Sequence, residues 1–326
     1  MGPEFQLIEA FVGAARASPP APAGPGDDTA VLPRPRGEIC LTVDAVVEDV
    51  HFRRASSRLQ DVGHKALAVN LSDLAAMGAR PRWALVALGV PRGFSLREAR
   101  ALGAGFGALA RESGTALVGG NVTRAPGLSV TVTVGGEVAA GRALLRSGAR
   151  PGEVVWVSGT LGDARLGLVL MERPGGVEAR RLRRRPRLAG EARARQRRPS
   201  ARLELGEALI GLASSCIDLS DGLVQDAGHL AASSGVALRL ALDALPCSGA
   251  LEAAYPEAGE RARTAASGGE DYELLFTAPP SRRAALDRLA RRLGLRLTPI
   301  GEVCAGRGVH VAGARASSLR GFDHLA

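Results

Sequence analysis

Apolar and polar residues follow two periods along this chain, and their alternation predicts a protein built from both strands and helices. In the first half, segments with strand-like alternation and many aliphatic residues are 37–52, 82–91, 115–120 and 128–138. Segments 61–79 and 95–114 instead repeat apolar residues at helical spacing. Ser95 and Glu98 have the spacing of a capping box, which predicts where the second helix begins.

The alternation restarts after a stretch at 147–152 that contains glycine and proline, and this predicts a second domain. Its expected strands are 153–158, 236–241, 272–277, 297–303 and 308–312, and its expected helices start near 162 and cover 201–213, 221–234 and 281–293. We therefore predict an α/β protein of the α+β type with two domains, 1–148 and 149–326, close to the roughly 150 residues expected per domain.

Composition narrows the class of protein. Hydrophobic residues make up 46% of the chain and aromatic residues only 3%, so the cores are expected to be aliphatic. Charged residues, glycine or proline interrupt every apolar run before about 18 residues, so we expect no membrane span. Residues 1–17 have the pattern of an amphipathic helix and not of a signal peptide. The four cysteines are scattered without a CxxC pair, which indicates a reduced, cytoplasmic protein without a zinc site.

The formal net charge is +9, and arginine supplies almost all of the positive charge because Lys65 is the only lysine. Combined enrichment in arginine, alanine and glycine is typical of a GC-rich coding bias. The densest arginine run, 178–202, is interpreted as a solvated basic face. The alternative is a nucleic-acid-binding patch, but no aromatic residues interleave the arginines, so base stacking is not supported. We expect no nucleic-acid partner.

Short carboxylates beside serine, threonine or glycine recur in several segments: Asp27, Asp28, Asp44, Asp73, Asp218 and Asp221. Oxygen ligands of this kind suit Mg²⁺ that is shared with substrate phosphates. The alternative is that each aspartate is an ordinary turn or cap residue. Asp73 fits that alternative least, because it lies inside an apolar helical pattern. The spacing does not match an EF-hand loop.

Glycine pairs provide a second kind of candidate site. Segments 117–123 and 157–167 place glycines where main-chain N–H groups can approach a phosphate, although a tight turn explains them equally well. In 267–276, Glu270 and Asp271 follow a glycine pair and are expected at a strand edge. Because no Walker lysine is available, a nucleotide would have to be held by Mg²⁺, arginine and main-chain N–H groups. His51 either faces the same site as Asp44 or is an ordinary strand-end residue.

Several motifs that occur in a fixed order along the chain indicate a resemblance to one known family. GDDTAVL, LTVDAVVEDVHF, NLSDLAAMG, GGNVTR, VSGTLGDARLGL, IDLSDGL and SGGEDYELLF occur in this order. The chain resembles the thiamine-monophosphate kinases of the aminoimidazole-ribonucleotide-synthetase-like ATP-binding superfamily over nearly its whole length. The resemblance implies an N-terminal mixed sheet with helices, which binds ATP and Mg²⁺ and forms a homodimer. It also implies a C-terminal α/β domain that completes the ATP and substrate site.

The implied activity is transfer of the ATP γ-phosphoryl group to thiamine monophosphate with the help of several Mg²⁺ ions. By motif, the implied metal ligands are Asp28, Thr42, Val43, Asp44, Asp73, Asn121, Asp218 and Asp221. The implied ATP contacts are Gly120, Asn121, Arg146 and Ser220, and the implied substrate contacts are His51, Glu270 and Phe322. Asp44, Asp73, Asp218 and Arg146 are the residues expected to promote the chemistry. Because a phosphate monoester is already anionic near neutral pH, no general base is expected and transfer is direct and in line.

Two positions depart from the family pattern. Val43 replaces a threonine, which is harmless if that position binds metal through its carbonyl and removes a ligand if it binds through a hydroxyl. Asn121 replaces an aspartate and removes one negative charge. Within the superfamily, aminoimidazole-ribonucleotide synthetase is the alternative activity. The selenophosphate-synthetase-like and hydrogenase-maturation members use a cysteine near one terminus, where this chain has none.

Overall fold

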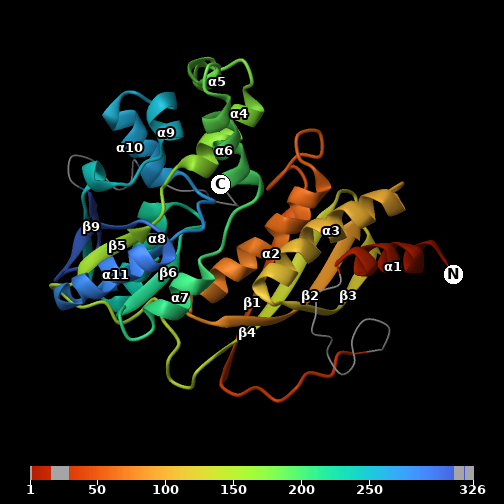
Figure 1. The fold of residues 1–326 in the computed structure, drawn as a ribbon, viewed down its shortest axis with the longest axis horizontal. Coiled ribbons are helices and arrows are strands. Elements are labelled where there is room, and N and C mark those ends of the chain that lie inside the picture. The colour runs from red at the N-terminus through yellow and green to blue at the C-terminus, as the bar shows by residue number, and fades with distance from the viewer. Residues whose placement is uncertain (1, 16–28, 312–318, 320–326) are drawn as a thin grey trace. The chain divides into compact units, whose positions relative to one another are not determined.

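The computed structural model of the protein describes residues 2–15, 29–311 and 319, so the predicted site residues Asp28 and Phe322 lie outside the described residues. Its contacts divide the chain into two compact units. The first unit comprises residues 1–74 and 79–141, and the second comprises 75–78 and 142–326. Each unit has its own sheet and its own helices (Figure 1).

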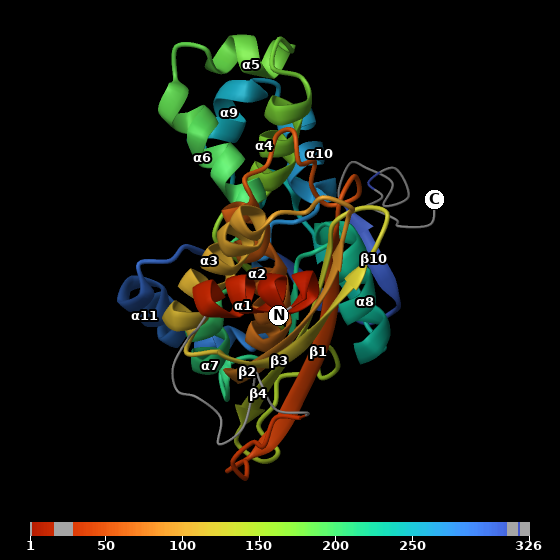
Figure 2. The ribbon, with the colours of Figure 1, turned by 90° about the vertical axis from the view of Figure 1, so that its right-hand side faces the viewer.

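The first unit contains a mixed sheet of four strands in the order β1-β4-β2-β3. Its strands are β1 (Glu38–Val47), β2 (Arg80–Val90), β3 (Ala116–Arg124) and β4 (Ser129–Val138), and its helices are α1 (Pro3–Ala15), α2 (Leu59–Ala76) and α3 (Leu96–Ser113). β4 pairs antiparallel with β1 and β2, whereas β2 and β3 run parallel. The helices lie against one face of the sheet, as Figure 2 shows.

Side chains of the strands separate into a buried and an open face. Val46 of β1, Val86 of β2 and Val132 of β4 are at most 4% exposed. On the opposite face of β1, Ile39, Leu41 and Val43 are exposed by 50%, 63% and 60%. A strand places successive side chains on alternate faces, so β1 carries an apolar face that this unit leaves open.

Glycines allow α2 and α3 to approach each other closely. A Cβ added to Gly105 of α3 would lie 1.8 Å from the carbonyl oxygen of Gln60 in α2. A Cβ added to Gly63 of α2 would lie 2.0 Å from the carbonyl oxygen of Leu102. The predicted capping box at Ser95 is confirmed, and α3 ends at Gly114, whose φ of 71° suits glycine.

The second unit contains a six-stranded sheet in the order β10-β7-β9-β5-β8-β6. Its strands are β5 (Val154–Ser158), β6 (Ser215–Asp218), β7 (Ala237–Leu240), β8 (Leu274–Ala278), β9 (Leu297–Cys304) and β10 (Gly308–Val311). Its α-helices are α4 (Asp163–Glu172), α5 (Val177–Leu182), α6 (Pro186–Arg197), α7 (Leu203–Leu209), α8 (Leu223–Ser234), α9 (Gly249–Ala254), α10 (Ala258–Ser267) and α11 (Arg283–Leu293). Two short 3₁₀ helices cover Leu242–Ala244 and Pro280–Arg282.

Two apolar clusters fill the second unit. One is aliphatic apart from Tyr255 and includes Leu166 of α4 and Leu230 of α8, both fully buried. The other contains Trp156 and Phe276, whose stacked rings have centroids 6.4 Å apart. The expectation of aliphatic cores is therefore confirmed for the first cluster, whereas the second uses one of the two tryptophans of the chain.

The main differences between the structure and the predicted elements lie in three places. The strand predicted over 37–52 ends at Val47, because the chain turns through Asp49 with a φ of 64°. The basic run 178–202 contains α5 and α6, whose dense arginines hide the apolar period. The short helices α9 and α10 had no predicted counterpart. Among the described residues, no helix has both the length and the hydropathy of a membrane span.

We expect Gly105→Ala to destabilise the protein by about 1–3 kcal/mol, because the added methyl group would collide with the main chain of α2. Gly228→Ala in α8 is the matched control, since no atom lies within 4 Å of its added Cβ. The control should stabilise the protein by about 0.5–1 kcal/mol, the usual gain of alanine over glycine in a helix. Urea-induced unfolding of both variants measures the difference. Equal effects of the two substitutions would show that the α2–α3 contact is not tight.

Candidate active site

Oxygen donors from β1 and α2 meet on the covered face of the first sheet. The hydroxyl of Thr42 donates a hydrogen bond to Oδ2 of Asp73 at 2.5 Å. Asp44 lies two residues along β1 from Thr42 and therefore points to the same face. Val43 points to the opposite face, so its side chain cannot join this group and only its carbonyl oxygen remains available. The fold thus gathers Thr42, Asp44 and Asp73.

His51 does not end the strand as predicted, but lies in the turn that follows β1. Its Nδ1 accepts a hydrogen bond from the Val47 N–H at 3.1 Å, so the proton of a neutral ring is on Nε2. The buried ammonium group of Lys65 donates to the His51 carbonyl oxygen at 3.2 Å. The only lysine of the chain therefore holds this turn, a role that its position in an apolar helix pattern did not indicate.

The sequence predicted a strand that ends at Gly120. In the structure, Gly120 and Asn121 lie inside β3, which continues to Arg124. A Cβ added to Gly120 would lie 2.0 Å from the carbonyl oxygen of Val86 in β2. Close approach of two strands is therefore sufficient to require this glycine. The side chain of Asn121 is exposed on the same edge strand, where its amide oxygen can reach a ligand.

In the second unit, β6 ends at Asp218, which is 4% exposed, and the chain passes through Ser220 and Asp221 into α8. Gly222 precedes this helix with a φ of 122°, and an added Cβ would lie 3.0 Å from the Ser267 carbonyl oxygen. The positive φ and the lack of space for a Cβ both explain why residue 222 is glycine.

Asp226 is a site residue that the sequence analysis missed. Its Oδ2 accepts the N–H groups of Asp221 and Gly222, both at 3.1 Å. Burial, together with the nearby charges of Asp218 and Asp221, raises the pKa of Asp226 to about 8. Its signal in the sequence was an acid in the first turn of a helix. Asp221, Asp226 and His229 each offer a ligand atom within 4.8 Å of the others.

Arg146 lies beside β6 in the same unit. The carbonyl oxygen of its neighbour Leu145 accepts the Cys216 N–H at 2.8 Å, and the Arg146 carbonyl oxygen accepts the Ser234 hydroxyl at 3.0 Å. The Arg146 side chain is exposed. The main chain of this segment is therefore anchored on both sides, while the guanidinium group stays accessible.

Main-chain hydrogen bonds join the IDLSDG and SGGEDY motifs. The Glu270 N–H donates to the Ser220 carbonyl oxygen at 2.7 Å, and the Tyr272 N–H donates to the Leu219 carbonyl oxygen at 2.8 Å. The Leu219 N–H returns a bond to the Glu273 carbonyl oxygen, also at 2.8 Å. Glu270 and Tyr272 have φ values of 65° and 50°, which are uncommon for residues other than glycine. The predicted metal and substrate motifs are therefore parts of one local structure.

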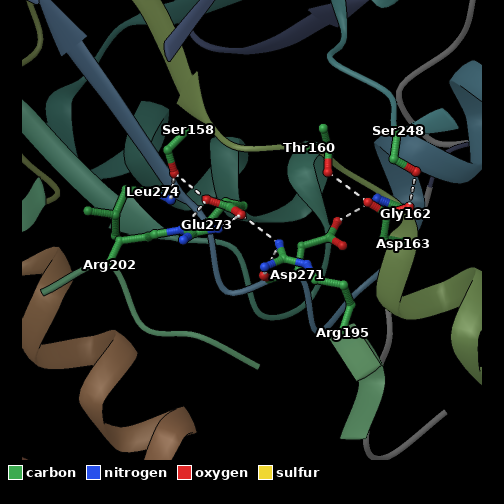
Figure 3. Close-up of polar contacts among 10 residues, drawn as sticks. All are labelled: Ser158, Thr160, Gly162, Asp163, Arg195, Arg202, Ser248, Asp271, Glu273 and Leu274. Carbon is green, nitrogen blue, oxygen red and sulfur yellow. Dashed lines mark hydrogen bonds and ion pairs between the residues drawn. The ribbon is translucent and has the colours of Figure 1, made fainter. Parts of the chain in front are cut away.

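A buried ion cluster supports this local structure (Figure 3). The fully buried carboxylate of Glu273 accepts bonds from Arg202 Nε at 2.7 Å, Ser158 Oγ at 2.6 Å and Arg195 at 2.5 Å. Burial raises its pKa, but hydrogen bonds and charge from Arg202, with the charge of Arg195, outweigh that effect and lower the pKa overall. Two arginines of the basic run 178–202 therefore point inward as counter-charges, whereas Arg183, Arg184 and Arg185 are exposed.

Asp271 occupies the position where the sequence indicated a possible anion site before α4. Its Oδ2 accepts the Gly162 N–H at 2.8 Å, and Gly162 precedes α4 with a φ of 82° (Figure 3). Asp271 is 2% exposed, so it is not presented at a strand edge as predicted. Burial raises its pKa to about 8, although the Gly162 bond and the charge of Arg195 act in the opposite direction. The Gly162 N–H therefore donates to a carboxylate of the protein itself, and not to a phosphate ligand as the possible anion site would require.

The donor sets fit Mg²⁺ by their chemistry. Thr42, Asp44 and Asp73 supply a hydroxyl and carboxylates, and Asp218 and Asp221 supply further carboxylates. Oxygen donors of this kind suit a hard cation. The charges of Asp218 and Asp221 raise the pKa of Asp226, and a bound cation would relieve that repulsion.

Comparisons with known proteins identify the family of the chain. The family model described as AIR synthase related protein, N-terminal domain, matches residues 26–138, and the corresponding C-terminal domain model matches 150–313. Thiamine-monophosphate kinase of Escherichia coli K12 is 41% identical over 93% of this chain and 90% of its own length. The Bacillus subtilis relative of the same name is 35% identical over 92% of this chain and 91% of its own length.

Solved structures give the same result. The crystal structure of thiamine-monophosphate kinase from Stenotrophomonas maltophilia has a TM-score of 0.85 and 42% identity, covering 95% of this chain and 97% of its own. A structure described as AaThiL complexed with AMPPCP and TMP has a TM-score of 0.78 and 36% identity, covering 92% of this chain and 91% of its own. The chain therefore belongs to the thiamine-monophosphate kinase family, whose two domains are those of the AIR-synthase-related proteins.

Proposed function

We propose that this protein transfers the γ-phosphoryl group of ATP to the phosphate of thiamine monophosphate, which yields thiamine diphosphate and ADP. Relatives named thiamine-monophosphate kinase cover more than nine tenths of the chain, and one relative was solved with AMPPCP and TMP. The observation that carries the proposal is the joining of the acidic IDLSDG motif to the Glu270 segment by main-chain hydrogen bonds. The motif that we assign to metal and ATP and the segment that we assign to the substrate therefore belong to one local structure.

Residue roles in this proposal follow the family motifs. The metal ligands are Asp28, Thr42, Asp44, Asp73, Asn121, Asp218 and Asp221, with Val43 through its carbonyl oxygen. Gly120, Asn121, Arg146 and Ser220 bind ATP, and His51, Glu270 and Phe322 bind thiamine monophosphate. The outward position of the Val43 side chain supports the carbonyl alternative for that residue.

The acceptor explains why the site has acids but needs no general base. The second pKa of a phosphate monoester is about 6, so the acceptor oxygen is already an anion at neutral pH. Bringing two anions together is then the main barrier, and positioning with charge neutralisation lowers it. Mg²⁺ held by these carboxylates supplies that neutralisation when it is bound. The exposed guanidinium of Arg146 adds positive charge from a main chain that is anchored on both sides.

Substrate recognition is assigned to two groups of opposite character. Thiamine carries a permanently positive thiazolium ring, which the carboxylate of Glu270 complements. His51 presents an Nε2–H donor, because its Nδ1 is already occupied by the Val47 N–H. A donor of this kind can bind an acceptor atom of the substrate.

The open face of β1 supports a homodimer. Ile39, Leu41 and Val43 form a row of exposed aliphatic side chains on an edge strand. Exposed apolar surfaces of this kind usually bind another protein chain. Two copies joined through their N-terminal sheets would bury this row. The four free cysteines support a reducing cytoplasmic location.

The activity is tested by incubating the purified protein with ATP, Mg²⁺ and thiamine monophosphate and measuring thiamine diphosphate by chromatography. We expect product that disappears when EDTA is added and returns with excess Mg²⁺. Formylglycinamidine ribonucleotide is the matched control substrate for the alternative synthetase activity. Turnover of the control without any thiamine diphosphate would refute the proposal.

Substitution of Thr42 tests the donor set in the first unit. Thr42→Val keeps the shape of the side chain but removes the hydroxyl that contacts Asp73, so kcat/KM should fall about 10- to 100-fold. Thr42→Ser keeps the hydroxyl and should retain most of the activity. Equal activity of the two variants would exclude a role for this oxygen.

Substitution of Leu41 tests the dimer. Leu41→Arg places a charge in the centre of the aliphatic row and should convert the dimer to a monomer, as measured by light scattering after gel filtration. Ala108→Arg on the exposed surface of α3 makes the same charge change and should leave the dimer intact. A wild-type protein that elutes as a monomer would contradict the proposal.

A further inference from the structure

The Glu270 segment, residues 268–273, has a left-handed residue on each side of Asp271. Glu270 has a φ of 65° and Tyr272 a φ of 50°. Residues other than glycine keep this conformation only where surrounding contacts hold them in it. Asp271 is 2% exposed and is joined to each of them by a peptide bond, so its contacts act directly on their main chain.

The start of α4 holds the Asp271 side chain. Oδ2 of Asp271 accepts the N–H of Gly162 at 2.8 Å, across 109 positions of the sequence (Figure 3). Among the described residues, no group donates a hydrogen bond to Oδ1. One oxygen of the carboxyl group therefore makes the contact, and the other can be replaced by nitrogen without loss of a hydrogen bond.

Close packing keeps the segment against two neighbours. A Cβ added to Gly162 would lie 3.1 Å from Cα of Ala265, and a Cβ added to Gly268 would lie 3.4 Å from Cα of Gly162. A Cβ added to Gly269 would instead lie 2.7 Å from the Ser220 carbonyl oxygen. The glycine pair that precedes Glu270 therefore lets the chain contact both the start of α4 and the IDLSDG motif.

The surroundings of Asp271 favour a neutral group that accepts a hydrogen bond. Burial raises its pKa to about 8, and the charges of Asp163 and Glu273 act in the same direction, against the Gly162 bond and the charge of Arg195. The carboxyl group is therefore mainly neutral at pH 7. Arg195 contacts the main chain of Asp271, because it donates to its carbonyl oxygen at 3.3 Å.

We propose that Asp271 is a positioning residue, which fixes the main chain of Glu270 against the start of α4 and so sets where the Glu270 side chain meets thiamine monophosphate. The inference rests on the proposed function, in which Glu270 binds this substrate. The IDLSDG motif keeps its separate support from Asp226. Loss of the Asp271 contact should therefore weaken binding of thiamine monophosphate and change binding of ATP little.

The test compares Asp271→Leu with Asp271→Asn. Leucine has the branched shape of aspartate but no acceptor, so the Gly162 N–H would lose its partner, whereas asparagine keeps an acceptor oxygen. We expect the KM for thiamine monophosphate to rise about tenfold in Asp271→Leu and to stay within about twofold of wild type in Asp271→Asn. The KM for ATP should stay within about twofold in both variants.

Hydrogen exchange measures the position of the main chain directly. The Glu270 and Tyr272 N–H groups donate to the carbonyl oxygens of Ser220 and Leu219, so these two amides should be protected in the wild type. Asp271→Leu should speed their exchange about tenfold, because the segment loses its anchor on α4. Asp271→Asn should keep the protection.

A control variant separates positioning from a general loss of stability. Leu286→Ala removes a fully buried side chain from α11 in the same unit, so it destabilises the unit without changing a contact of Asp271. It should leave the KM for thiamine monophosphate and the exchange of the Glu270 segment unchanged. If Asp271→Leu does not yield folded protein, Asp271→Ser, which is too short to reach Gly162, is measured against the same expectations.

The outcomes distinguish this inference from the proposed function. Unchanged exchange and KM in Asp271→Leu, or equal KM values in Asp271→Leu and Asp271→Asn, would overturn the positioning role. A rise in KM in the Leu286→Ala control would overturn it too. If Glu270→Gln raises the KM for thiamine monophosphate and Asp271→Leu does not, only the positioning role fails. If Glu270→Gln leaves that KM unchanged, the substrate role of Glu270 fails, and the inference fails with it.

Discussion

A fully buried carboxylate is stable only with counter-charges, and Glu273 obtains two from Arg195 and Arg202. Loss of one partner from such a buried pair typically costs about 3–5 kcal/mol, because it leaves a desolvated charge behind. The same arginines fix the end of α6 and the start of α7 beside the Glu270 segment. The segment that joins the IDLSDG and SGGEDY motifs therefore depends on that cluster.

Three other buried acids are stabilised in different ways. Asp226 and Asp271 each accept main-chain N–H groups at the start of a helix, α8 and α4, and burial raises both pKa values to about 8. Glu153 instead accepts the hydroxyls of Ser214 at 2.5 Å and Thr277 at 2.8 Å. Only Glu273 is paired with cations among these four. Arginine side chains therefore neutralise the buried charge of Glu273. The other three carboxyl groups instead accept hydrogen bonds from main-chain N–H groups or hydroxyl groups.

This distinction explains the arginine-rich segment. A solvated basic face describes Arg183, Arg184 and Arg185, but Arg195 and Arg202 are internal counter-ions and Arg181 donates to the Ala254 carbonyl oxygen at 2.7 Å. The segment is thus part surface and part scaffold. The expectation that it binds no nucleic acid stays a prediction.

Local chemistry in the sequence was sufficient to predict the alternation of strands and helices, the cap at Ser95 and the acidic motifs, because each depends on a few neighbouring residues. It also predicted which side chains have metal-binding chemistry. The family resemblance, and not the spacing of Asp218 and Asp221, supplied the role of these residues.

Other features were decided only by contacts between distant segments. Asp271 turns inward because Gly162, more than one hundred residues away, offers it an N–H group. Lys65 acquires its role in the same way, because its ammonium group holds the carbonyl oxygen of His51, fourteen residues away. Residue type and spacing determined which chemistry this chain carries, and tertiary packing decided which of its buried carboxylates are paired with arginine and which are held by N–H groups or hydroxyls, because those partners come from distant segments.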